Sequence, residues 1–117
     1  MQYQLPLICV LNAPKRVPQE TVNQWQTPHD AITWAYDNRD NKTVKTKKWI
    51  AENLGMRVQH VTRMLDRRDL KLDMVQAHVL DCLCGWTACD QFKELEVKRI
   101  AERAAADLVT AMQKRVA

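Results

Sequence analysis

Residues 47–66 read KKWIAENLGMRVQHVTRMLD, and the spacing of their apolar side chains predicts two short helices joined at Gly55. Before the glycine, three apolar residues fall at i, i+1 and i+4: Ile50, Ala51 and Leu54. After it, four apolar residues make a second helical stripe: Met56, Val61, Met64 and Leu65. Glycine adopts the left-handed conformation that ends a helix without strain. The stretch therefore predicts a helix-turn-helix motif.

The polar side of the second helix carries side chains that suit contacts with nucleic acid. They donate or accept hydrogen bonds: Arg57, Gln59, His60, Thr62 and Arg63. Charge favours the same partner, because residues 42–71 hold nine lysines and arginines against three acidic residues in a chain whose net charge is +4. A basic face on such a motif is typical of a protein that binds a polyanion. The alternative is a solvated lysine-rich surface.

An all-α domain is expected around this motif. The chain has 117 residues and two glycines, and its prolines stop at Pro28, so nothing after Ala31 forbids helix. Thr27, Pro28 and Asp30 form a capping-box start, and Thr87 with Asp90 forms a second. Five helices are predicted, with these approximate bounds: 27–38, 43 or 46 to 55, 57–66, 70–85, and 87 onward.

The two ends of the chain differ from the predicted domain. Residues 1–26 contain a short apolar run interrupted by prolines, and we interpret them as an arm. Residues 27–85 form the helix-turn-helix domain. Residues 86–117 lack glycine and proline and keep apolar residues at helical spacing. A helix this long cannot bury its full length on so small a core, so we expect dimerisation through it. The alternative is a helix that folds back onto its own domain.

Other chemistry finds little support in the sequence. His78 and Cys82 share a helix face that could bind zinc, but no CxxC pair accompanies them. No glycine-rich phosphate loop, HExxH or nucleophile elbow is present, so we expect no enzyme, no metal, no cofactor and no small-molecule ligand. No apolar run is long enough to span a membrane, and no signal peptide is evident.

The segment DAITWAYDNRDNKTVKTKKWIAENLGMRVQHVTRMLD, residues 30–66, resembles the lambda-repressor-like domains of phage repressors and Cro-type regulators. Within that group it resembles small phage regulators of CII type, over roughly residues 29–85. The resemblance implies that the start of the second helix enters the major groove. The implied base-contacting residues are Arg57, Val58, Gln59, Thr62 and Arg63. At Arg57 the chain departs from the pattern, since many relatives have serine or another small polar residue there.

The expected function is sequence-specific regulation of transcription by a homodimer on double-stranded DNA, in the cytoplasm and nucleoid of a bacterial host. Arg57 and Arg63 are candidates for guanine, Gln59 for adenine and Val58 for a thymine methyl group. The residues expected to contact phosphate are Lys45, Thr46, Lys47, Lys48, His60, Arg67 and Arg68. One alternative is a protein-interaction module, such as an antitoxin or host-factor inhibitor, on the same scaffold. Another is sequence-neutral packaging of nucleic acid.

Overall fold

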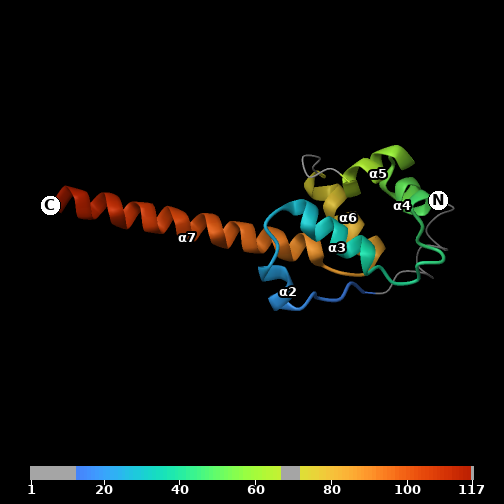
Figure 1. Cartoon of the computed structure of the whole chain (residues 1–117), viewed down its shortest axis with the longest axis horizontal. Helices are drawn as coiled ribbons and strands as arrows, with labels where there is room; N and C mark the ends of the chain where they lie inside the picture. Colours follow the sequence, from blue (N-terminus) through green and yellow to red (C-terminus); the bar gives the residue numbers. More distant parts are fainter. Residues whose placement is uncertain (1–12, 67–71, 117) are drawn as a thin grey trace.

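The computed structural model describes residues 13–66 and 72–116. In that part of the chain the regular structure is α-helical and no strand is present, which confirms the all-α class. The helices are α2 (Gln19–Asn23), α3 (Pro28–Asp37), α4 (Lys47–Leu54), α5 (Val58–Asp66), α6 (Met74–Cys84) and α7 (Ala88–Val116). Helices α2 to α6 gather around the beginning of α7, and the rest of α7 extends away from them as a rod (Figure 1).

Local signals set most helix ends where the sequence predicts them. The Thr27–Asp30 capping box opens α3, and the Asp30 carboxylate accepts from the N–H of Thr27 at 3.1 Å. Gly55 and Gly85 end α4 and α6 at φ 70° and 86°, the left-handed region that favours glycine. Helix α6 begins at Met74, and the predicted start near residue 70 lies outside the described residues.

The start of α7 differs from the prediction. Thr87 and Asp90 do not form the capping box, because the Thr87 hydroxyl donates to Gln91 instead, at 2.7 Å. The free N–H groups of the first turn are bound by Asp81 of α6, whose carboxylate accepts from Cys89 at 2.9 Å and from Asp90 at 3.0 Å. A residue of the preceding helix therefore caps α7.

Residues 13–26, part of the segment interpreted as an arm, pack against the helices of the folded body. Val17, Val22 and Trp25 are buried in the core. Gln91 of α7 holds this segment with two bonds to the backbone of Val17, accepting at 2.6 Å and donating at 2.9 Å. Lys15 pairs with Trp86 in a parallel bridge. The prolines of this segment interrupt regular structure without preventing burial of the side chains between them.

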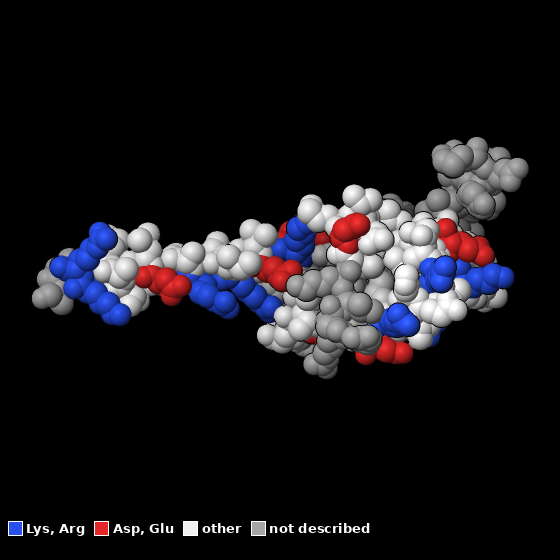
Figure 2. Space-filling model, turned by 90° about the horizontal axis from the view of Figure 1, so that it is seen from above, with Lys and Arg blue, Asp and Glu red and all other residues white. Residues whose placement is uncertain are grey.

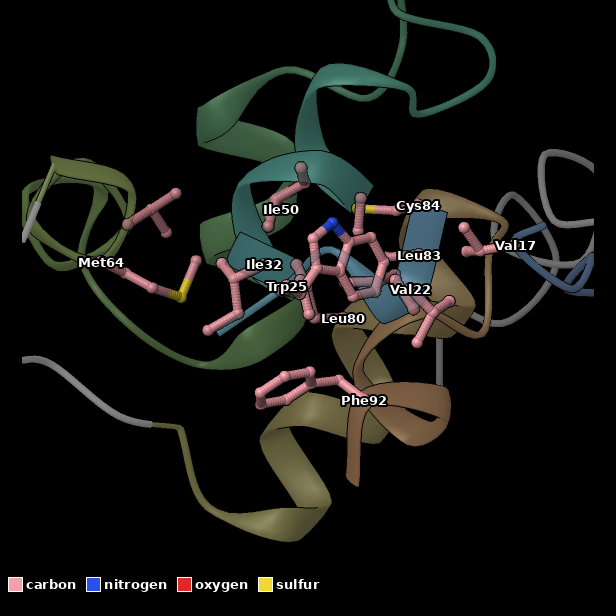
Figure 3. Packing of buried hydrophobic residues seen from close by; sticks show 14 of the residues in the cluster. Val17, Val22, Trp25, Ile32, Ile50, Met64, Leu80, Leu83, Cys84 and Phe92 are labelled. Atoms are coloured by element: carbon pink, nitrogen blue, oxygen red, sulfur yellow. The ribbon is translucent and has the colours of Figure 1, made fainter. Parts of the chain in front are cut away.

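Aromatic packing joins the amino-terminal segment to the helices. Trp25 lies in the midst of apolar side chains from several helices (Figure 3). Its ring centroid is 5.9 Å from that of Trp34 and 6.4 Å from that of Phe92. Trp34 meets Trp86 edge to face at 4.9 Å, and the Trp86 indole donates to the Asn38 carbonyl. Trp25 is therefore a core residue, and Trp34 and Trp86 pack at the edge of the core.

Helix α7 has two parts with different surroundings. Its first part packs on α2, α3 and α6, with Ala88 and Phe92 buried. Residues 100–115 are exposed along their whole length. Among the described residues, no helix combines the length and apolar character needed to cross a membrane.

Candidate nucleic-acid interface

Helices α4 and α5 are joined by a three-residue turn. The Thr46 hydroxyl caps α4 by accepting from the Trp49 N–H at 3.2 Å. At the other end the Met56 N–H donates to the Ala51 carbonyl at 3.0 Å, across the left-handed Gly55. This bond satisfies a carbonyl at the end of α4 and turns the chain so that α5 can begin at once.

Contacts from the core fix the inner side of α5. Val61 and Met64 are buried among the core residues. The Nε2 atom of His29, on α3, lies 2.6 Å from the carbonyl oxygen of Leu65 near the end of α5. A carbonyl only accepts, so the Nε2 atom carries the proton and donates. His29 thus anchors α5.

The outer side of α5 presents polar side chains that are free to bind a partner. Gln59 and Arg63 are exposed and lie one turn apart, with the half-buried Thr62 beside them. Within the described part of the chain, the side chains of Gln59 and Arg63 form no hydrogen bond or ion pair. Val58 is 39 % exposed at the start of the helix. Four of the five predicted base-contacting residues therefore share one accessible helix.

The fifth, Arg57, lies in the turn rather than on the helix. Its carbonyl accepts from the N–H groups of His60 and Val61, at 3.0 and 3.3 Å, so it occupies the position before the first turn of α5. An arginine side chain has no acceptor and cannot cap the free N–H groups there. The exposed guanidinium and the uncapped N–H groups leave the start of α5 electropositive.

The predicted phosphate contacts divide into three groups. Lys48 and His60 are exposed and Lys47 is half-buried, so their side chains reach solvent. Thr46 is exposed, but its hydroxyl is already engaged as the α4 cap. Arg67 and Arg68 lie outside the described residues.

Lys45 is a correction to the prediction, because its side chain is fully buried. Its ammonium group forms an ion pair with Asp40. The Arg39 Nε donates to the Lys45 carbonyl at 2.6 Å and holds the same loop against α3. A phosphate cannot reach an ammonium group enclosed in this way, so Lys45 is a structural residue of the α3–α4 loop.

Burial of Lys45 removes one positive charge from the basic surface that the sequence suggested. With Lys45 set aside, the described part of residues 42–66 carries five basic side chains against two acidic ones. Seen from the side on which α4 and α5 lie, the basic side chains form separate groups with acidic side chains between them (Figure 2). Asp66 follows Arg63 by three residues on the same helix and lowers its net effect.

Cys84 is buried in the core, and Cys89 is partly buried against it. Burial raises the pKa of the Cys84 thiol to about 12 and raises that of Cys89 further, so both are neutral at pH 7. The Sγ atom of Cys82 lies 3.8 Å from Nε2 of His78. The Nδ1 atom of the same histidine lies 2.9 Å from the Asp90 carboxylate. Among the residues that the structure describes, no group of three or more His, Cys, Asp or Glu side chains is placed to hold a metal ion.

Comparison of the chain with protein-family models, with curated proteins and with solved structures found no match.

Proposed function

We propose that the chain is a sequence-specific, DNA-binding regulator of transcription, of phage or prophage type, that acts as a homodimer in the bacterial cytoplasm. In this proposal the domain is a five-helix, lambda-repressor-like helix-turn-helix fold formed by α3 to α7. The α5 helix reads bases in the major groove, and the start of α4 positions the domain on phosphates.

One observation carries the proposal, namely the free polar face of α5. Gln59 and Arg63 lie one turn apart on it without partners in the described chain, while Val61 and Met64 fix the opposite side in the core. A rigid helix with an unpaired donor face suits the major groove, where arginine binds guanine and glutamine binds adenine in bidentate fashion.

Burial of Lys45 removes one of the predicted phosphate contacts. Among the described residues of α4, α5 and the turn between them, the accessible cations are Lys47, Lys48, Arg57 and Arg63. Counterion release by these four cations gives a slope of log K against log salt of about −4 per monomer, which is modest. Two copies on one DNA molecule would double the slope and supply the affinity that one domain lacks.

A fluorescence-anisotropy titration tests the proposal, with DNA fragments from the genomic neighbourhood of the gene at two salt concentrations. The wild type is compared with an Arg57→Ala/Arg63→Ala variant. The control is Lys15→Ala/Lys93→Ala, which removes the same charge from exposed positions away from α5. We expect tight binding to one fragment, lost by the α5 variant and kept by the control.

Two other results would contradict the proposal. Weak binding that is equal for all fragments would indicate sequence-neutral packaging of nucleic acid. Absence of binding would favour a protein-interaction module, such as an antitoxin or an inhibitor of a host factor. The exposed apolar side chains on the distal part of α7 favour that second candidate, because they offer a surface that DNA does not need.

A further inference from the structure

The distal part of α7 carries an apolar stripe that faces away from its own domain. Val97, Ile100, Leu108 and Met112 are 61, 64, 62 and 58 % exposed. Val97 and Leu108 belong to a repeat with alternating intervals of four and three residues. Its members are Val97, Ala101, Ala104, Leu108 and Ala111. This interval is the seam of a two-helix coiled coil.

The stripe does not continue the contact between α7 and the domain. That contact uses Phe92, Leu95 and Arg99, and Arg99 donates to the Trp25 carbonyl at 2.8 Å. Val97 follows Leu95 by two residues, which is about 200° around a helix of 3.6 residues per turn, so it lies on the opposite side. A second helix can therefore approach the stripe from the side that the domain leaves open.

Charged side chains form a row along one edge of the stripe. The row begins at Glu96. It continues with Arg103, Asp107 and Lys114, which follow Glu96 by 7, 11 and 18 residues, or about two, three and five helical turns. All four lie in that row, and none forms an ion pair in the described part of the chain. Their signs along the row are negative, positive, negative, positive.

We propose that α7 pairs with α7 of a second copy in antiparallel orientation, centred on Ala105. In an antiparallel pair each edge of the stripe faces the same edge of the other helix. With this centre, Glu96 lies beside Lys114 of the second copy and Arg103 lies beside Asp107 of the second copy. Twofold symmetry repeats both, so all four charges of each row meet an opposite charge.

The same register matches large side chains with small ones. Leu108 lies at the level of residue 102 of the second copy, where Ala101 and Ala105 border the stripe and leave space for it. Alanine at three stripe positions and at Ala105 on its edge allows the helix axes to approach closely. The overlap from residue 96 to 114 is about 27 Å long at a rise of 1.5 Å per residue.

A parallel pair fits the charges less well. It would set the charged row against the other edge of the stripe, where Lys98, Ala105 and Val109 lie. Asp107 and Lys114 would then face apolar side chains. Lys114 and Arg115 of both copies would also meet at one end. The charge pattern therefore selects the antiparallel orientation.

The inference deepens the homodimer of the proposed function, and its test uses no DNA, so each can fail alone. Sedimentation equilibrium of the full chain gives the dimer Kd for the wild type and for Glu96→Lys, Lys114→Glu and the double variant. Glu96 and Lys114 are about 27 Å apart in one chain and cannot interact within it. We expect each single reversal to raise Kd by about tenfold and the double reversal to return it to within about threefold.

Lys98→Glu is the matched control, because it makes the same charge change on the other edge of the stripe. In the antiparallel pair Lys98 lies beside Met112 of the second copy, so Kd should change by less than about threefold. In a parallel pair Lys98 approaches Glu96, and the reversal would weaken the dimer. Additive weakening in the double variant, or a wild type that stays monomeric, would overturn the inference. Circular dichroism melting of each variant monitors the fold.

Discussion

Replacing Lys45 separates the role that the sequence assigns to this residue from the role that its burial indicates. The Lys45→Met change keeps an unbranched side chain of similar length and removes only the charge. Breaking a buried ion pair typically costs about 3–5 kcal/mol, because the remaining charge is left without compensation. Asp40 is 42 % exposed, so water can solvate its carboxylate after the change. We therefore expect a loss of about 2 kcal/mol, below that range.

A second variant checks the packing part of the argument. Lys45→Ala also removes three buried methylene groups, each worth about 0.8 kcal/mol. The total loss should then be about 4–5 kcal/mol, against about 2 kcal/mol for Lys45→Met. In a domain of this size, 2 kcal/mol corresponds to a fall in Tm of about 8–16 °C.

The assay is thermal and urea unfolding at one fixed protein concentration, because self-association makes the apparent stability depend on concentration. Lys48→Met serves as the control, since Lys48 is exposed and forms no ion pair in the described chain. Its Tm should stay near that of the wild type, while its DNA salt slope should become shallower by about one unit.

One result would refute the reasoning. If Lys45→Met melted like the wild type and lost DNA affinity as Lys48→Met does, the Lys45 ammonium group would be in solvent. The burial of Lys45 in the α3–α4 loop would then be wrong.

Three further predictions concern helix ends and pH. Arg57→Ser should stabilise the fold by about 1 kcal/mol, since serine caps the open start of α5, and should weaken DNA binding, as denaturation and anisotropy would show together. Gly85→Ala should lower Tm more than Gly55→Ala; both glycines have positive φ, but only at Gly85 would a Cβ meet another side chain, the Asp40 carboxylate at 3.1 Å. Burial raises the pKa of Asp81 to about 6 in the folded chain, so the stability that its neutral form supplies is complete below pH 3.8 and is lost as pH rises through 6. Relative to Asp81→Asn, the wild type should lose about 2 kcal/mol between pH 4 and 7 in urea titrations, and parallel pH profiles would contradict this.

The helix positions are largely encoded in short sequence segments. The Asp30 side chain caps α3 by binding the backbone N–H of Thr27, three residues earlier. Gly55 and Gly85 end helices because glycine readily adopts the left-handed backbone conformation. Interactions over three or four residues do not depend on the rest of the fold, so pattern reasoning finds them. The free polar face of α5 belongs to the same class, because the spacing of Val61 and Met64 already shows which side is buried.

The tertiary structure decided what depends on residues distant in the chain. Gln91 binds the backbone of Val17, 74 residues earlier, and this contact holds the amino-terminal segment against the core. No local sequence pattern predicts such a long-range hydrogen bond. Asp81 takes over the α7 cap from Thr87 because the end of α6 passes beside the first turn of α7. Lys45 resembles any surface lysine in the sequence, and only the folded α3–α4 loop encloses it with Asp40. Burial of a charge is a property of the assembled neighbours, whereas a helix cap is a property of a few consecutive residues.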